Sequence, residues 1–432
     1  MSAASKKRSA DHLDDPAAAS SSKRVSAKPV FPVFDKPGAA ADTTPSTFQW
    51  LPPLGPNKTC LHAINLAPES RPKVAALDLD GCLIQSSFPK KAKGSAPPTF
   101  QWWRPIIPNK LKELYDDGYA IVIVTNQALK SAALVEWKKK LPLIGAALPD
   151  VPFRLFAATA RDGFRKPMPG MWYELERIFA EGGVTIDKKA SIFVGDAAGR
   201  ASDFAGTDRK WALNLDLPFH TPEEFFLKLP QAPYTLTGFH PSSLQPDAPP
   251  ILPSSTPLLP SPLTSELVLF VGPPALGKST FFRRHFAPAG YVHVNQDTLK
   301  TREKCVRAAK EALQEGKAVV VDNTNRDRTT RKLYVDVART AGVPIRCFVF
   351  TGSVELAWHN NLYRAYNLPP ALAASEPKRE VLPYMAFSSF RAAYEEPAQD
   401  EGFAEIRRVQ WTFEGDEEAR GRWNMWLQVD GK

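Results

Sequence analysis

Six runs of apolar residues recur along the chain, and most of them end in polar residues. They are KVAALDLD (73–80), YAIVIVTN (119–126), ASIFVGDA (190–197), ELVLFVG (266–272), KAVVVDNTN (317–325) and PIRCFVF (344–350). Val, Ile and Phe without polar alternation are typical of strands buried on both faces, and such strands form the parallel sheets of α/β proteins. Amphipathic stretches between the runs predict helices. We therefore expect two α/β domains with ligands at the carboxyl ends of their strands.

Two segments of biased composition divide the chain. Residues 1–45 are rich in Ala, Ser, Pro and charge, which predicts a disordered basic tail. Residues 238–265 are dense in Pro and Ser, cannot form a helix or a central strand, and predict a semi-rigid linker. The folded domains are then expected at 46–237 and 266–432.

Composition limits the class of protein and the cellular compartment to which the chain can belong. The chain has no uninterrupted apolar run of the roughly 20 residues that a membrane span needs, and its N-terminus does not resemble a secretory signal. Its 4 cysteines lack disulfide or zinc spacing, which favours a reducing compartment. The net charge of +9 suits either an anionic partner such as nucleic acid or a solvated surface. The basic clusters KKR (6–8) and KR (23–24) predict nuclear import.

The strand ends of the first domain carry the groups of a phosphoryl-transfer site. Asp78 and Asp80 lie on the same side of a strand end, where a divalent cation would let both stay ionised. One carboxylate can attack phosphorus while the other exchanges a proton with the leaving oxygen. Thr125 and Lys166 could hold phosphate oxygens, and Asp196 would complete a magnesium site.

The motifs DLDGCLI, IVTNQ, RKP and VGDAAGR, in this order, resemble those of the haloacid dehalogenase superfamily of aspartate-nucleophile phosphatases. The resemblance implies a Rossmann-like phosphatase fold in which Asp78 is the nucleophile and Asp80 the general acid and base. It assigns phosphate binding to Thr125, Asn126 and Lys166, and Mg²⁺ binding to Asp78, Asp196 and the backbone carbonyl of Asp80. Arg200 stands where many members carry a second acid, and Asp203 is the nearby alternative.

The segment between the first two motifs is too short for the cap domain of many such phosphatases. We expect only a loop and a helix between Ile84 and Ile121, and hence an open site that favours a large substrate. The segment combines basic and aromatic side chains, which suit a nucleic-acid backbone and unstacked bases. The alternative is that the tryptophans belong to the core and the lysines are solvated. The residues are Lys90, Lys91, Lys93, Phe100, Trp102 and Trp103.

The second domain contains GxxxxGK[ST] directly after a buried strand, which predicts a nucleotide-binding P-loop. Lys278 should reach the β- and γ-phosphates of ATP, and Ser279 should hold Mg²⁺. A kinase that acts on a hydroxyl also needs a carboxylate base, and Asp297 and Asp322 are both candidates. The expected ATP-binding residues are Gly272, Pro273, Pro274, Ala275, Leu276, Gly277, Lys278, Ser279 and Thr280.

The motifs VGPPALGKST, YVHVNQDTL, DNTN and ELAWHNN resemble the kinase half of the polynucleotide kinase 3′-phosphatases. Together with FRKPMPGMW and the other phosphatase motifs, the similarity extends over residues 48–432 in the domain order of that family. It implies a P-loop kinase with a parallel central sheet and Asp297 as general base. Asp322 and Asn323 would organise the same site, and Arg364 would stabilise the transferred phosphoryl group.

The resemblance implies a monomeric, nuclear DNA-repair enzyme that removes 3′-phosphates and phosphorylates 5′-hydroxyls with ATP. Its partners would be DNA ends, with other repair proteins possible. Three alternatives remain: an enzyme that heals RNA ends, an end-binding scaffold whose sites have decayed, and a metabolite phosphatase fused to an unrelated ATPase. Decay would first remove residues such as Asp78, Lys278 or Asp297, and all three are present.

Overall fold

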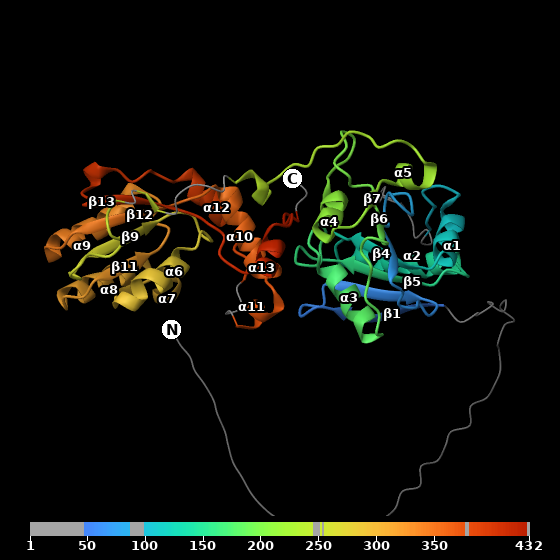
Figure 1. Cartoon of the computed structure of the whole chain (residues 1–432), viewed down its shortest axis with the longest axis horizontal. Helices are drawn as coiled ribbons and strands as arrows, with labels where there is room; N and C mark the ends of the chain where they lie inside the picture. The colour runs from blue at the N-terminus through green and yellow to red at the C-terminus, as the bar shows by residue number, and fades with distance from the viewer. Residues whose placement is uncertain (1–46, 87–98, 245–250, 253–254, 376–379, 430–432) are drawn as a thin grey trace, which may run out of the picture. The chain divides into compact units, whose positions relative to one another are not determined.

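The computed structural model describes residues 47–86, 99–244, 251–252, 255–375 and 380–429. These residues form two sheets flanked by helices (Figure 1). The first has seven strands in the order β1-β2-β5-β4-β3-β6-β7, and the second has six in the order β10-β11-β9-β12-β13-β8. The expected α/β class is confirmed, and each sheet is described separately below.

The first sheet places the apolar runs of the first domain side by side. Strands β7, β6, β3, β4 and β5 are parallel neighbours, while β2 and β1 extend the sheet antiparallel. The strands are β1 Phe48–Leu54, β2 Cys60–Asn65, β3 Lys73–Leu77, β4 Tyr119–Asn126, β5 Phe153–Ala158, β6 Ile192–Val194 and β7 Phe219–His220. The helices are α1 Ile107–Asp116, α2 Ser131–Ala146, α3 Gly170–Glu181, α4 Thr207–Leu215 and α5 Pro222–Leu227.

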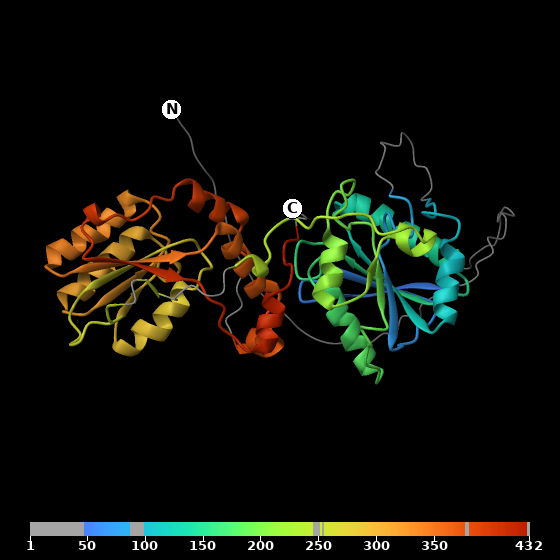
Figure 2. The same ribbon diagram turned by 45° about the horizontal axis from the view of Figure 1, so that its top comes forward.

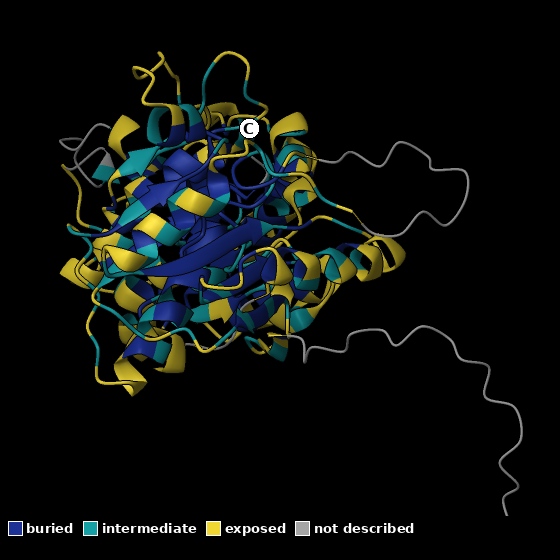
Figure 3. Ribbon diagram, turned by 90° about the vertical axis from the view of Figure 1, so that its right-hand side faces the viewer, coloured by how far each residue is buried: buried dark blue, intermediate teal, exposed yellow. Residues whose placement is uncertain are grey.

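Helices cover both faces of this sheet. One apolar core takes Leu111 of α1 and Trp137 of α2, and a second core takes Trp172 of α3 and Trp211 of α4. In Figure 2 the cyan helix α1 and the green helices α3 and α4 lie on opposite sides of the strands. The central strands are buried, and the helices expose only their outer faces (Figure 3). This two-sided burial explains why β3 and β4 read as uninterrupted apolar runs.

The second sheet is parallel from β10 to β13. Its strands are β8 Ile251–Leu252, β9 Leu267–Val271, β10 Val292–Val294, β11 Val319–Asp322, β12 Ile345–Thr351 and β13 Glu405–Gln410. The helices are α6 Lys278–Phe281, α7 Gln296–Leu299, α8 Arg302–Gln314, α9 Arg328–Ala341, α10 Val354–Tyr366, α11 Pro370–Ser375, α12 Tyr384–Ala392 and α13 Glu417–Trp423. A π-helical turn, Phe282–Phe286, continues α6, and short 3₁₀ turns lie at Pro241–Ser243, Ala287–Ala289 and Gln399–Glu401.

Part of the expected linker belongs to the second sheet. Strand β8 pairs antiparallel with β13 at the sheet edge. Farther along, Arg407 donates to the carbonyl of Pro257 at 2.9 Å, and Arg346 donates to that of Leu258 at 3.0 Å. Proline excludes a chain segment from a central strand but not from the neighbourhood of an edge strand. The predicted linker over 238–265 therefore includes an edge strand and contacts the second sheet at these residues.

A buried ion pair secures the start of β9. Arg346 of β12 donates two hydrogen bonds to Glu266, at 2.7 and 2.5 Å, and the hydroxyl of Tyr291 donates to the same carboxylate. Glu266 is buried, so removing its charge leaves the guanidinium without its main partner.

We expect Glu266→Ala to lower the free energy of unfolding of the second domain by about 3–5 kcal/mol. Glu266→Gln, which keeps the acceptor for Tyr291, should lower it less. Urea denaturation, followed by loss of each activity, measures the effect. A loss below about 1 kcal/mol for the alanine variant, a value typical of an exposed pair, would contradict the prediction.

Two further findings concern the whole described chain. All four cysteines are buried and free. No helix within the described ranges is long and apolar enough to cross a membrane.

Candidate active sites

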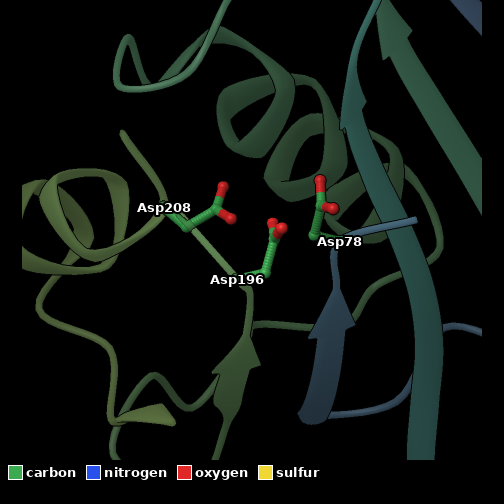
Figure 4. A group of neighbouring side chains, drawn as sticks. All are labelled: Asp78, Asp196 and Asp208. Atoms are coloured by element: carbon green, nitrogen blue, oxygen red, sulfur yellow. The ribbon is translucent and has the colours of Figure 1, made fainter. Parts of the chain in front are cut away.

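Three aspartates converge at the carboxyl edge of the first sheet (Figure 4). Asp78 follows β3, Asp196 follows the adjacent strand β6, and Asp208 lies in the first turn of α4. Each offers one carboxylate oxygen, and the three oxygens lie within 4.8 Å of one another. Gly81 has φ of +91°, and a Cβ there would lie 2.1 Å from the Asp196 carboxylate, so only glycine fits. The oxygen-only donor set suits Mg²⁺.

The third acid is Asp208, which sequence reasoning missed. Its carboxylate accepts the backbone N–H of Ala197 at 3.0 Å, which holds the start of α4 against the strand end. The structure brings Asp208, and not the alternative Asp203, into this cluster. Asp203 accepts the backbone N–H groups of Ala198 and Arg200 and the guanidinium of Arg200, each at 3.0 Å, so it closes its own loop. The sequence signal for Asp208 was weak, because Asp196 and Asp203 are also acids of this region and lie in or closer to the motif.

Lys166 lies between the carboxylates. Its Nζ is 2.6 Å from Asp78 and 2.7 Å from Asp208, and it donates to the carbonyl of Val124 at 3.0 Å. Asn126 was expected to bind phosphate. Instead its amide accepts the backbone N–H of Lys166 at 2.9 Å and donates to the backbone carbonyl of Lys166 at 3.1 Å. Both ends of the amide are engaged, so Asn126 supports the lysine.

The electrostatics of this cluster favour a cation. Burial raises the pKa of Asp78 well above its usual value, although Lys166 opposes the shift. Burial, with Asp208 nearby, raises the pKa of Asp196 to about 7. Burial opposes the charge on Lys166, but Asp208 and Asp78 outweigh it and raise the pKa of the lysine. Three carboxylates thus share one ammonium, and a divalent cation would compensate the remaining negative charge.

Gln127 orients the proposed general acid. Its side-chain amide donates to Asp80 Oδ2 at 2.8 Å and to the hydroxyl of Thr125 at 3.0 Å. Burial raises the pKa of Asp80, and the hydrogen bond from Gln127 opposes that rise. Both Gln127 and Thr125 are buried. Gln127 stood inside a recognised motif, yet only the folded chain shows that it contacts Asp80.

We expect Gln127→Leu to slow hydrolysis of the 3′-phosphate substrate that the motifs imply by about 10- to 100-fold, because correct placement of a general acid contributes roughly 10²–10⁴. A p-nitrophenyl phosphate should lose less, since its aryl oxide leaves without needing a proton. The ratio of the two rates is the measurement. Equal losses for both substrates would show that Gln127 does not act through the proton donor.

The aromatic residues of the short insert are partly packed. Trp102 pairs antiparallel with Ile84, and the ring of Trp103 lies 6.2 Å from that of Phe226. Phe100 also packs against the core. This favours the interpretation that the tryptophans are structural. The lysines at 90, 91 and 93 lie outside the described residues. Helix α1 follows the insert, as expected.

The nucleotide loop follows β9 and leads into α6. The Nζ of Lys278 donates to the carbonyls of Gly272 and Pro273, at 3.0 and 2.7 Å. Burial lowers the pKa of this lysine to about 8, with Asp322 opposing the shift. Ser279 donates its hydroxyl proton to Asp322 at 2.5 Å. The loop thus places a cation and a hydroxyl beside the carboxylate at the end of β11.

Asp297 lies close to the same strand end. Its backbone N–H donates to Asn295 at 2.8 Å, and that of Gln296 donates to Asn323 at 2.8 Å. Asp297 itself is exposed, so it can meet a substrate. Asp322 is buried, and the side-chain oxygen of Asn323 already accepts the backbone N–H of Gln296. Of the two carboxylates considered as base, exposure favours Asp297.

Beside the loop is an aromatic cavity of about 230 Å³. Arg364 of α10 lines it and lies close enough to Lys278 to help lower the pKa of that lysine. Flat apolar walls next to a phosphate loop suit a nucleobase. Sequence reasoning missed the walls because they come from distant segments. The aromatic residues are Phe281, Phe350, Tyr363, Trp411, Phe413 and Trp423.

Comparisons with known proteins agree with these two sites. Residues 73–226 match the family described as "Polynucleotide kinase 3 phosphatase", and residues 267–308 and 300–388 match an AAA domain. The chain is 37% identical over 361 residues to the "Bifunctional polynucleotide phosphatase/kinase" of Schizosaccharomyces pombe, covering 82% of this chain and 83% of that protein.

Two other relatives point the same way. A "Putative bifunctional polynucleotide phosphatase/kinase" of Acanthamoeba polyphaga mimivirus is 32% identical over 383 residues, covering 79% of this chain and 85% of that protein. The "Polynucleotide 3'-phosphatase ZDP" of Arabidopsis thaliana is 35% identical over 179 residues, covering 38% of this chain and 25% of that protein. The chain belongs to the family of bifunctional polynucleotide phosphatase/kinases.

Proposed function

We propose that this chain makes broken DNA strands ligatable, by hydrolysing 3′-phosphates in its first domain and phosphorylating 5′-hydroxyls with ATP in its second. One observation carries the proposal: a single chain contains both the aspartate–lysine cluster and a nucleotide loop with an exposed carboxylate nearby. The names of its relatives support a polynucleotide substrate for both activities. The basic net charge of +9 suits that anionic substrate.

In the phosphatase, Asp78 attacks the phosphorus of the 3′-phosphate. The bond from phosphorus to the 3′-oxygen breaks, and that oxygen takes its proton from Asp80, which Gln127 holds in place. Water then attacks the aspartyl-phosphate and returns a proton to Asp80, which frees inorganic phosphate and Asp78. Lys166 and the hydroxyl of Thr125 stand beside these acids to hold phosphoryl oxygens.

We assign Mg²⁺ to both sites. In the phosphatase, Asp78, Asp196, Asp208 and the backbone carbonyl of Asp80 would hold it. In the kinase, Ser279 would hold it, with Asp322 behind. When bound, the ion would neutralise phosphoryl oxygens and the excess charge of the acids.

In the kinase, Asp297 accepts the proton of the 5′-hydroxyl while its oxygen attacks the γ-phosphorus of ATP. The bond between the γ-phosphorus and the bridging oxygen breaks, and ADP leaves. Lys278 and Arg364 supply positive charge to the phosphates, and the aromatic cavity takes the adenine.

The test uses a nicked duplex with a 3′-phosphate and a 5′-hydroxyl, with Mg²⁺, with and without ATP. We expect loss of the 3′-phosphate under both conditions and gain of a 5′-phosphate only with ATP. A matched nick in RNA is the control for the polynucleotide type. Activity on RNA alone would replace DNA with RNA, and binding without any reaction would favour the scaffold.

We also propose that the protein acts in the nucleus, supported by the clusters at residues 6–8 and 23–24. A fluorescent fusion of the full chain should concentrate in nuclei. Alanine replacement of both clusters should distribute it through the cell. An unchanged distribution would contradict the assignment.

A further inference from the structure

His293 of β10 reaches across to the carboxylate at the end of β11. Its Nε2 lies 3.0 Å from Asp322 Oδ2, the oxygen that also accepts the hydroxyl proton of Ser279. Since an ionised carboxylate only accepts, the imidazole donates this hydrogen bond. Both donors use Oδ2, so neither occupies Oδ1, which could accept from a further donor such as a cation-bound water.

The ring of His293 is itself held in place. Phe282, in the turn that continues the P-loop helix, stacks on it with ring centres 4.0 Å apart and planes at 11°. Phe282 and Asp322 are buried, and the His293 side chain is 32% exposed. The imidazole therefore lies between the helix that begins at the nucleotide loop and the carboxylate behind that loop.

The same strand end carries the proposed base. Beyond His293, the side chain of Asn295 donates to the backbone carbonyl of Asp322 at 2.7 Å, and the backbone of Gln296 donates to Asn323 at 2.8 Å. Asp297 follows directly. Three hydrogen bonds thus join the ends of β10 and β11, and only that of His293 reaches the carboxylate of Asp322.

We propose that His293 is a positioning residue of the kinase, which fixes the Asp322 carboxylate toward the cation–nucleotide site and aligns that site with Asp297. This inference rests on the proposed kinase activity. Without the imidazole, the carboxylate would keep Ser279 as its side-chain donor and could turn about its own axis. The hydrogen bonds from His293 and Ser279, acting against burial, keep the pKa of Asp322 below its usual value.

Three variants separate the hydrogen bond from the stacking contact. His293→Phe keeps an aromatic ring but removes the donor, and His293→Gln restores a donor at a similar reach. Phe282→Leu removes the stack and keeps the donor. The primary measurement is equilibrium binding of a fluorescent ADP analogue, N-methylanthraniloyl-ADP, with Mg²⁺ and with EDTA. The kcat and KM for a 5′-hydroxyl oligonucleotide and the 3′-phosphatase rate are measured on the same preparations.

We expect His293→Phe to bind the nucleotide normally in EDTA. Adding Mg²⁺ should increase its affinity about tenfold less than it increases that of the wild type, which is the size expected for a charge-assisted hydrogen bond. His293→Gln should recover most of that gain. Wild-type Mg²⁺ dependence in His293→Phe would overturn the proposal. So would a glutamine variant as weak as the phenylalanine variant, or a loss in Phe282→Leu as large as in His293→Phe, because packing would then explain the effect.

Normal nucleotide binding in EDTA shows that the kinase domain of each variant is folded, and the phosphatase rate shows the same for the first domain. If the wild type binds the nucleotide but phosphorylates no 5′-hydroxyl, the proposed kinase fails. The binding comparison would still decide whether His293 positions Asp322.

Discussion

Asp78→Asn is expected to lower hydrolysis of a 3′-phosphate by a factor on the order of 10⁵–10⁶, comparable with the loss of a covalent nucleophile in other enzymes. An amide oxygen of the same shape cannot form the aspartyl-phosphate. The fold should survive, because Lys166 keeps Asp208 at 2.7 Å and one of three mutually repelling carboxylates is lost. The kinase rate of the same sample should stay within about twofold of the wild-type rate, since Asp78 lies outside the kinase site.

The measurement is release of phosphate from a 3′-phosphorylated nick, with acid quenching to trap the phosphorylated wild type. Asp150→Asn is a matched control, because Asp150 is an exposed acid in the same domain. A variant at Asp78 that keeps more than about one hundredth of the rate would remove this residue from the role of nucleophile. Parallel loss of kinase activity would indicate misfolding instead.

Lys278→Ala is expected to lower 5′-phosphorylation by a factor on the order of 10³, the upper range for removing one preorganised electrostatic group. The Lys278 ammonium is held by two loop carbonyls, so its charge is in place before the nucleotide arrives. It then meets the β- and γ-phosphates, where charge develops during transfer. Alanine leaves that charge without its nearest cation, although Arg364 and Arg284 still line the cavity.

Rapid-quench assays with excess ATP separate weaker binding from slower transfer, and both should be affected. Lys317→Ala is the control, since Lys317 is an exposed lysine paired with Glu315 in the same domain. The 3′-phosphatase rate should not change in either variant. If Lys278→Ala phosphorylates 5′-hydroxyls at near the wild-type rate, the loop does not hold the reacting nucleotide.

Local sequence was enough to predict the strands and the loops that follow them. The runs at β3, β4 and β9 are apolar on both faces because each is a central strand. Burial on both faces requires consecutive apolar residues, which the sequence shows directly. Parallel strands end at one edge, so Asp78 and Asp196 could be expected to meet. The P-loop could be predicted equally well, because its lysine and serine directly follow the second glycine of the motif.

Contacts between distant segments could not be read in this way. Asp203 lies before α4 and Asp208 in its first turn, and only the folded chain shows that Asp208 is the one that joins Asp78 and Asp196. The amide of Asn126 turned to the backbone of Lys166, 40 residues away, instead of to a phosphate. Strand β8 paired at a sheet edge where its proline-rich context predicted a spacer.

The order of residues along the chain was therefore enough to predict the fold class and the two chemistries, and to nominate residues for contact with phosphate, because these depend on short motifs with fixed spacing. The tertiary structure alone decided which groups support them: Gln127 on Asp80, Asp208 beside Lys166, and His293 on Asp322. The physical reason is that these supporting contacts join residues that are far apart along the chain. A side chain that acts through another needs only to reach it in space, and packing brings together residues that no pattern along the chain connects.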